Sequence, residues 1–299
     1  TEKILFAKWQ RSLIGERVLI IMKEMTVKDN FINLSDVKEI PHAELFREVA
    51  KVIAEDTLQY INEHDKKVEP RESFYTKYGK RFIDIVISFF ALILTLPINL
   101  IIGIGTLMDV GLPLFFKQER VGKDGKIFTL VKFRNMTNKK DKNGDLLPPS
   151  QRVTQFGKFV RKTSLDELLN FWSIFKGDMS LIGPRPLLVD YLDSYSERHM
   201  MRHAVRPGLE CPILQIKKKE LTWADQFENE VYYVENVSLL LDIKMVYGLV
   251  RMVFDKKATA VRGGAFRGSF MGYNRDGSSI SSLKVPVEYY EKAVKRLGY

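Results

Sequence analysis

Two adjacent carboxylates, Asp166 and Glu167, stand in the segment RKTSLDELLN, which begins with a pair of cations. A carboxylate can attack an electrophilic centre as a nucleophile, and its oxygens are ligands that Mg²⁺ prefers. Ser164, three residues before Glu167, completes a capping-box pattern and predicts the start of a helix. Two interpretations stay open: the carboxylates only favour the helix N-terminus, or they act on a phosphate whose charge cations or a metal neutralise.

Cations that could neutralise such a substrate occur on both sides of this segment. Lys132 lies in KFRNM, Arg161 begins RKTSLDELLN, and Arg185 is held between Pro184 and Pro186 in GDMSLIGPRP. Prolines on both sides restrict the backbone and present the guanidinium in one direction, which suits bidentate phosphate recognition. A rigid turn carrying an incidental arginine is the alternative.

These residues follow a long apolar segment. Residues 85–108 form a run of 24 residues without an ionisable side chain, long enough to cross a bilayer as a helix. Pro97 lies near its middle and should break or kink the helix. Cations flank both ends of the run: Lys77, Lys80, Arg81, Lys117 and Arg120. Cationic flanks prefer the cytoplasmic side. We therefore favour the interpretation that residues 74–110 form a re-entrant hairpin and not a simple transmembrane span.

The composition excludes several classes of protein. Apolar residues make up 45% of the 299 residues, so a disordered or low-complexity chain is excluded. The single cysteine, Cys211, cannot form an internal disulfide or a thiolate zinc cluster, which favours a reducing compartment. Residues 1–75 carry 12 Lys and Arg against 14 Asp and Glu, whereas residues 76–299 carry 35 against 23. The basic part therefore begins where the apolar run begins, and it could serve nucleic acid, anionic lipid or a phosphorylated substrate.

The remaining segments suggest four units. Residues 1–73 read as a small α/β accessory or docking unit, with a strand predicted at 17–23 and a helix at 43–61. The re-entrant hairpin would occupy residues 74–110 and a catalytic domain residues 111–254. Residues 255–299 form a C-terminal extension whose basic and aromatic residues most simply belong to surface packing.

Several motifs together resemble a known family. They are the start of the apolar run with Lys80, Arg81 and Asp84, QERVG at 118–122, KFRNM at 132–136, RKTSLDELLN at 161–170, GDMSLIGPRP at 177–186 and YYVENVSLLLDIK at 232–244. Each motif alone is weak, but their order and spacing are specific. Over residues 78–242 the chain resembles the bacterial sugar transferases, also called monotopic polyprenyl-phosphate phosphoglycosyl transferases.

The resemblance implies an α/β, mainly helical fold whose catalytic domain is membrane-associated through a re-entrant helix-break-helix. It implies transfer of a sugar phosphate from a UDP-sugar to polyprenyl (undecaprenyl) phosphate, which releases UMP and initiates glycan assembly. The reaction would take place on the cytoplasmic face of the bacterial inner membrane. Asp166 matches the nucleophile that forms a covalent aspartyl-phosphosugar, and Glu167 matches the residue that works with Mg²⁺. Substrate contacts are expected from Lys132, Arg134, Arg161, Pro184, Arg185 and Pro186.

Two departures from the family pattern are visible. LECPILQI follows Gly208 where many members carry a Gly-Trp type sequence, and Leu96 stands before Pro97 where some carry serine. The sugar therefore cannot be named, and the oligomeric state, a homo-oligomer included, stays open. Two rivals are a membrane-anchored scaffold without catalysis and a basic nucleic-acid binder. No nucleic-acid recognition motif accompanies the positive charge, so no nucleic-acid partner is expected.

Overall fold

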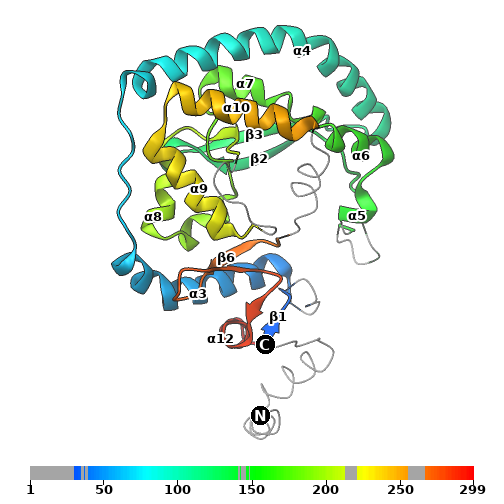
Figure 1. Ribbon diagram of the computed structural model, residues 1–299. Coiled ribbons are helices and arrows are strands. Elements are labelled where there is room, and N and C mark those ends of the chain that lie inside the picture. The colour runs from blue at the N-terminus through cyan, green and yellow to red at the C-terminus, as the bar shows by residue number, and fades with distance from the viewer. Residues whose placement is uncertain are drawn as a thin grey trace, which may run out of the picture.

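Figure 1 presents the computed structural model of the chain. It describes residues 30–34, 37, 40–140, 142, 146–147, 149–212, 221–254 and 267–299. Helices dominate and the paired strands are short, in agreement with the predicted α/β, mainly helical fold. The strand predicted at 17–23 and the second half of the LECPILQI segment, residues 213–216, lie outside the described residues.

The apolar run forms one very long helix. A π-helical turn, η2 (Tyr75–Gly79), leads into α4 (Lys80–Val110). Within the described residues this is the single helix long and apolar enough to cross a membrane by length and composition, with a mean hydropathy of 2.6 over its most apolar window. Only 11% of that window is buried against the rest of the protein. The apolar side chains of α4 therefore mostly face outward, unlike those of a core helix.

Pro97 does not break this helix. α4 continues through Pro97 as one element that curves over one end of the molecule (Figure 1). Nearby polar side chains bond within the helix: the Thr95 hydroxyl donates to the Ala91 carbonyl at 2.7 Å, and Asn99 donates to Thr95 at 3.3 Å. A proline removes one backbone donor and crowds the preceding turn, which bends a helix without necessarily ending it. The predicted helix-break-helix is thus corrected to a curved continuous helix.

Both ends of α4 are fastened to the same domain. Near its beginning, Arg81 donates to the carbonyls of Ile174 and Phe175 at 2.6 and 2.7 Å. These carbonyls belong to the last turn of α7 (Asn170–Lys176), where a cation is favourable. At the far end, Arg134 donates to the carbonyls of Val110 and Gly111. The apolar helix therefore leaves the domain and returns to it.

Two strand pairs carry the polar motifs. β2 (Phe115–Val121) and β3 (Ile127–Phe133) form an antiparallel hairpin around the short turn η3 (Lys123–Gly125), with Phe115 opposite Phe133. β4 (Ser180–Ile182) pairs in parallel with β5 (Gly208–Glu210). The backbones of the two segments approach so closely here that a Cβ on Gly208 would lie 2.1 Å from the Gly183 nitrogen. Only glycine fits at this contact.

Short helices connect and cover these strands. They are α5 (Pro149–Arg152), α6 (Gln155–Lys162), η4 (Leu165–Glu167), η5 (Val189–Ser194), α8 (Glu197–Met200), η6 (Met201–Ala204), α9 (Trp223–Asn236) and α10 (Leu239–Phe254). A shared core forms where Tyr233 of α9 and Met245 of α10 pack against Ile182 of β4. The core thereby fixes β4, and with it the loop that follows.

The two ends of the described chain fold together. α3 (His42–His64) confirms the helix predicted at 43–61. It packs with β6 (Phe270–Tyr273), β7 (Ser279–Ser281), β8 (Val285–Pro286) and α12 (Val287–Leu297), while β1 (Phe31–Ile32) pairs with β8. Ile53 and Tyr290, one from each end of the chain, lie fully buried in the same hydrophobic cluster. We call residues 30–64 and 267–299 the terminal unit; it lies at the end of the molecule away from α4 (Figure 1).

Candidate active site

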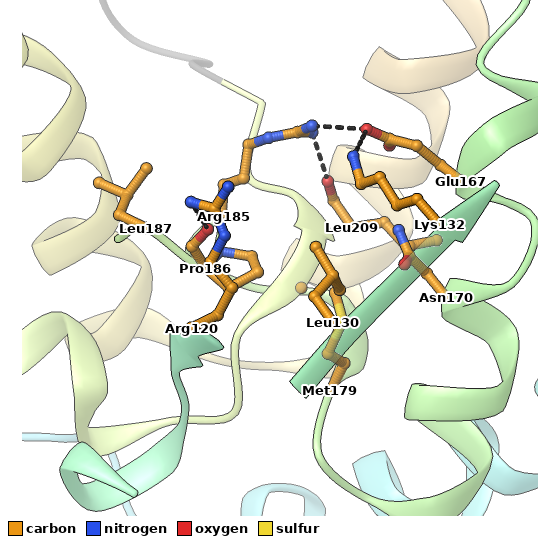
Figure 2. A pocket seen from close by; sticks show the side chains of 11 residues that line it. Arg120, Leu130, Lys132, Glu167, Asn170, Met179, Arg185, Pro186, Leu187 and Leu209 are labelled. Carbon is orange, nitrogen blue, oxygen red and sulfur yellow. Dashed lines mark hydrogen bonds and ion pairs between the residues drawn. The ribbon is translucent and has the colours of Figure 1, made fainter. Parts of the chain in front are cut away.

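A polar pocket opens between the two strand pairs and η4 (Figure 2). Its walls come from the β2–β3 hairpin, from the helical segment around residues 167–170, and from the segments that follow β4 and form β5. It is lined by Arg120, Leu130, Lys132, Glu167, Asn170, Met179, Arg185, Pro186, Leu187, Gly208 and Leu209. The fold therefore brings together motifs that are far apart in the sequence.

Glu167 joins two of the predicted cations. Its Oε1 accepts hydrogen bonds from Lys132 Nζ at 2.8 Å and from Arg185 Nη2 at 2.7 Å. Arg185 also donates to the Leu209 carbonyl at 3.2 Å and lies 3.6 Å from a carboxylate oxygen of Glu210. Figure 2 shows these three side chains converging from separate elements on the rim of the pocket. Charge-assisted bonds of this kind are short and about twice as strong as neutral ones.

The local backbone differs from the predicted helix start. Ser164 has φ 56 and ψ 23, in the left-handed region, and its side chain makes no capping hydrogen bond. Residues 165–167 form the single 3-10 turn η4, and α7 begins at Asn170. The capping-box prediction is therefore wrong. The physical reason is that a capping Ser needs an extended backbone, while the Glu167 side chain bonds to Lys132 and Arg185.

Asp166 has a different environment from its neighbour. Its residue is only 7% exposed, and Asn135 Nδ2 donates to its Oδ2 at 3.2 Å. Burial raises the pKa of Asp166 above its ordinary value; the charge of Glu167 adds to this, while Lys132 and Arg161 oppose it. A carboxylate that is less well stabilised is a more basic and more reactive nucleophile.

Glu167 is affected in the opposite direction. Burial alone would raise its pKa, but the charges of Arg185 and Lys132, and their hydrogen bonds, outweigh burial and lower the pKa to about 2. Glu167 is therefore ionised throughout the physiological range. Two neighbouring carboxylates whose environments separate their pKa values are typical of groups with different catalytic roles.

A buried ion pair supports Arg185 from behind. Arg202 and Glu230 are each 1% exposed and are joined by a bond of 2.7 Å. Arg202 Nη2 also donates to the backbone carbonyl of Arg185 at 2.6 Å. Its guanidinium packs over the rings of Tyr195 and Phe227, which contact Phe270 of the terminal unit. The terminal unit thus supports the shell that holds Arg185.

The remaining predicted site residues have varied positions. Pro186 lines the pocket, whereas Pro184 is buried and its carbonyl accepts from the Gly208 nitrogen at 3.0 Å. Arg161 is exposed on α6 and acts on Asp166 through its charge. Arg134 is not brought to the pocket, because its guanidinium binds the last carbonyls of α4. Arg134 therefore has a structural role at the end of α4.

Sequence reasoning missed three polar residues near the carboxylates. Asn135 contacts Asp166, and Asn170 and Arg120 line the pocket. Asn135 belongs to the KFRNM motif and Arg120 to QERVG, so the motifs contained them without distinguishing them from surface residues. Arg202, in contrast, carried no signal, because its partner Glu230 lies 28 residues away in the sequence.

The donor set near Glu167 suits one kind of metal site. Among the residues that the structure describes, no group of three or more His, Cys, Asp or Glu side chains could enclose a metal ion. Mg²⁺ commonly uses one or two carboxylates and completes its shell with water and substrate phosphates. Lys132 and Arg185 both donate to Oε1 of Glu167, so neither of them occupies its other carboxylate oxygen, Oε2. The residues present fit an Mg²⁺ ion that arrives with a phosphorylated substrate.

Comparison with known proteins decides the family. The model of the family described as bacterial sugar transferase matches residues 75–256, more than half of the chain. The chain belongs to the bacterial sugar transferase family. The resemblance inferred from the motifs is confirmed, and with it the interpretation of this protein as a transferase enzyme.

Several relatives have informative names. The chain is 43% identical over 174 residues to the uncharacterized sugar transferase EpsL of Bacillus subtilis. The matched region covers 58% of this chain and 86% of EpsL. It is 36% identical over 183 residues to the UDP-N-acetylgalactosamine-undecaprenyl-phosphate N-acetylgalactosaminephosphotransferase of Aeromonas hydrophila, covering 58% and 43%. It is 34% identical over 197 residues to the UDP-glucose:undecaprenyl-phosphate glucose-1-phosphate transferase of Escherichia coli, covering 60% and 41%. The match therefore spans less than half of these two relatives.

The opposite pKa shifts of the two carboxylates predict opposite effects on stability. Glu167→Gln should lower the free energy of unfolding at pH 7 by up to about 3 kcal/mol, because its carboxylate has a pKa of about 2 in the folded protein and 4.5 otherwise. That contribution is present above pH 4.5 and is lost as the pH falls toward 2. Asp166→Asn should raise stability at pH 7, because its folded pKa is raised and the ionised form is disfavoured by folding.

Thermal unfolding in detergent at pH 7 and pH 4 measures both effects. The gain from Asp166→Asn should shrink at pH 4, where the native carboxyl is more often protonated. Lys117→Gln, an exposed change on β2, serves as the control and should leave the melting temperature within a degree or so. Equal losses from Asp166→Asn and Glu167→Gln at pH 7 would contradict the assigned environments.

Proposed function

We propose that this protein transfers a sugar phosphate from a UDP-sugar to undecaprenyl phosphate or a related polyprenyl phosphate. The observation that carries the proposal is the pair Asp166 and Glu167: Asp166 is buried and has a raised pKa, and its neighbour Glu167 lines the pocket and is bound there by two cations. The names of relatives from Aeromonas hydrophila and Escherichia coli support this substrate class.

In the first step, a carboxylate oxygen of Asp166 attacks the β-phosphorus of the UDP-sugar. The bond from that phosphorus to the bridging oxygen breaks, its electron pair stays on that oxygen, and UMP leaves. The sugar phosphate is now joined to Asp166 as a mixed anhydride. Two anions would otherwise have to react directly, so a covalent intermediate divides one difficult displacement into two easier ones.

In the second step, an oxygen of polyprenyl phosphate attacks the same phosphorus. The bond to Asp166 breaks and its carboxylate is regenerated, so the product is a polyprenyl diphosphate sugar. Lys132 and Arg185 lie at the pocket, where both form ion pairs with the Glu167 carboxylate. Arg161 adds positive charge near Asp166. In phosphoryl transfer such positioning and electrostatic stabilisation supply most of the rate.

Glu167 is the residue that would hold Mg²⁺, through its Oε2 and together with phosphate oxygens of the donor. Bound there, the ion supplies positive charge to the transferring phosphoryl group. The Lys132 and Arg185 bonds to Oε1 keep the glutamate side chain in one orientation. Hydrogen bonds that fix the orientation of a metal ligand are important where the protein supplies few ligands to the ion.

The exposed apolar side chains support placement at a membrane surface. α4 carries half of the large ones in the described part of the chain, and α6, α7 and α10 contribute others, among them Phe159, Trp172, Leu240, Ile243 and Tyr247. Figure 1 shows α4, α7 and α10 gathered at one end of the molecule, opposite the terminal unit. Large apolar side chains exposed on several helices at one end of a molecule are typical of a membrane or protein contact. The protein would thus rest on the cytoplasmic face of the bacterial inner membrane.

The attachment of both ends of α4 supports a re-entrant path for this helix. Arg81 binds the end of α7, and Arg134 binds the end of α4 beside the β2–β3 hairpin. A helix crossing to the far side could not return its last turn to the same domain. Buried in this way, α4 would hold the pocket at the depth of the lipid phosphate, where the acceptor is located.

The proposed reaction predicts UMP release that depends on Asp166. Purified protein in detergent, assayed with a panel of UDP-sugars and polyprenyl phosphate, should release UMP with at least one donor. Asp166→Asn should reduce the rate by at least about 10³-fold, because an amide cannot act as the nucleophile. Its melting temperature should not fall. Turnover close to that of the wild type would remove Asp166 from the reaction.

The proposed metal role predicts a requirement for divalent cations. EDTA should stop UMP release, and added Mg²⁺ should restore it, because the charge on the transferring phosphoryl group would otherwise lack a partner. Glu167→Gln should require a higher Mg²⁺ concentration for half-maximal activity than the wild type. A rate that persists unchanged in metal-free buffer would overturn the metal role and leave Glu167 as a support for Lys132 and Arg185.

A further inference from the structure

Arg120 is a cation of the pocket to which the proposed reaction has so far given no role. It stands at the end of β2 on the same strand face as Gln118, and its guanidinium lies in the pocket wall. Nη2 donates to the Gln118 side chain at 2.6 Å and Nη1 to the Pro186 carbonyl at 3.3 Å. Nε is buried and has no hydrogen-bond partner among the described residues.

The charges around the pocket set Arg120 apart from the other two cations. Lys132 and Arg185 share the carboxylate of Glu167, and Arg185 also lies near Glu210. Within the described part of the chain, no carboxylate oxygen lies within the 4 Å of an ion pair with Arg120. Figure 2 shows Arg120 on the side of the pocket away from Glu167, with Arg185 between them.

This arrangement is costly without a ligand. Burial lowers the pKa of Arg120 and the charge of Arg185 lowers it further, while Tyr191 and the more distant charge of Glu167 only partly oppose this. A half-buried guanidinium with two neutral partners and a like charge nearby gains stability when an anion enters. Arginine is suited to phosphate because its planar fork offers two parallel donors. The pocket is therefore organised for a second phosphate group at a distance from the one that Glu167 and Asp166 would surround.

We propose that Arg120 binds the α-phosphate of the UDP-sugar and stabilises the UMP that leaves. The inference rests on the proposed function, because it takes the diphosphate donor from it. When the bond from the β-phosphorus to the bridging oxygen breaks, its electron pair and negative charge pass to the α-phosphate. A cation placed on the leaving-group side lowers the free energy of that charge. Lys132 and Arg185 would remain with the β-phosphoryl group.

The alternative is that Arg120 only braces the loop after β4 through Pro186. A brace would affect folding and every ligand of the pocket alike, whereas a phosphate contact affects ligands that carry the phosphate. UMP and uridine differ by that group alone, and they therefore separate the two roles.

The test uses the full-length protein in detergent and measures inhibition of UDP-sugar turnover by UMP and by uridine. Arg120→Met should raise the inhibition constant of UMP by at least about tenfold and leave that of uridine within about twofold, since a hydrogen bond to a charged group carries about that much binding. Arg120→Lys should recover part of the UMP affinity, because it keeps the charge and loses the fork. Lys117→Met, exposed on the same strand, is the matched control and should change neither constant.

The outcomes separate this inference from the proposed function. Equal UMP inhibition of the wild type and Arg120→Met, in a wild-type enzyme that releases UMP, overturns the role of Arg120 alone. Parallel losses for UMP and uridine would also overturn it and assign Arg120 to the brace. A wild-type protein that releases no UMP from any UDP-sugar would instead refute the proposed function. If Arg120→Met does not fold, the same comparison of UMP with uridine on Arg120→Lys decides the question, with a rise for UMP alone expected.

Discussion

One carboxylate oxygen, Oε1 of Glu167, holds the site together by accepting bonds from Lys132 and Arg185 at once. The three side chains come from η4, from β3 and from the loop after β4, so a single interaction fixes the relative position of three segments. Its half-buried environment strengthens the attraction and makes the loss of any partner costly. Glu167 also adds to the contrast with Asp166, because burial raises the pKa of Asp166 and the negative charge of Glu167 raises it further.

The rest of the fold maintains that interaction from two directions. From the side of the apolar helix, Asp84 of α4 accepts bonds from the Ser180 hydroxyl and the Leu181 nitrogen, both at 3.0 Å, and so holds β4. From the opposite side, Arg202 binds the carbonyl of Arg185 and rests on aromatic rings that continue into the terminal unit. The apolar helix and the terminal unit thus both reach the loop that carries Arg185. Packed elements of this kind keep reactive groups in place more accurately than loops alone can.

The sequence motifs identified several residues of the site but did not predict how these residues are arranged. The pairing of Asp166 with Glu167 and the rigid frame of Arg185 were recognisable because they are local patterns. The left-handed Ser164 was not, because nothing in a capping-box pattern reveals that its glutamate has partners elsewhere. Arg134 illustrates the same limit, since a cation in a motif can bind a ligand or cap a helix. The continuity of α4 through Pro97 could not be distinguished from a break, because a proline in a helical pattern can either bend or end the helix.

Long-range contacts explain the other differences. Arg202 and Glu230 form a pair only in the folded chain, and the common core of α3 and α12 joins residues more than 200 positions apart. Helical periodicity found α3, because its pattern is local and long. It could not indicate that the two ends of the chain pack together and extend toward Arg185.

In the proposed reaction, Asp166 becomes covalently bonded to the sugar phosphate. Intact-protein mass spectrometry can detect this adduct when the protein is given a UDP-sugar that it uses as donor and no polyprenyl phosphate. A mass increase equal to one phosphosugar is expected, absent in Asp166→Asn and removed when polyprenyl phosphate is added. UMP release without any adduct on the wild-type protein, or an adduct that persists in Asp166→Asn, would contradict it.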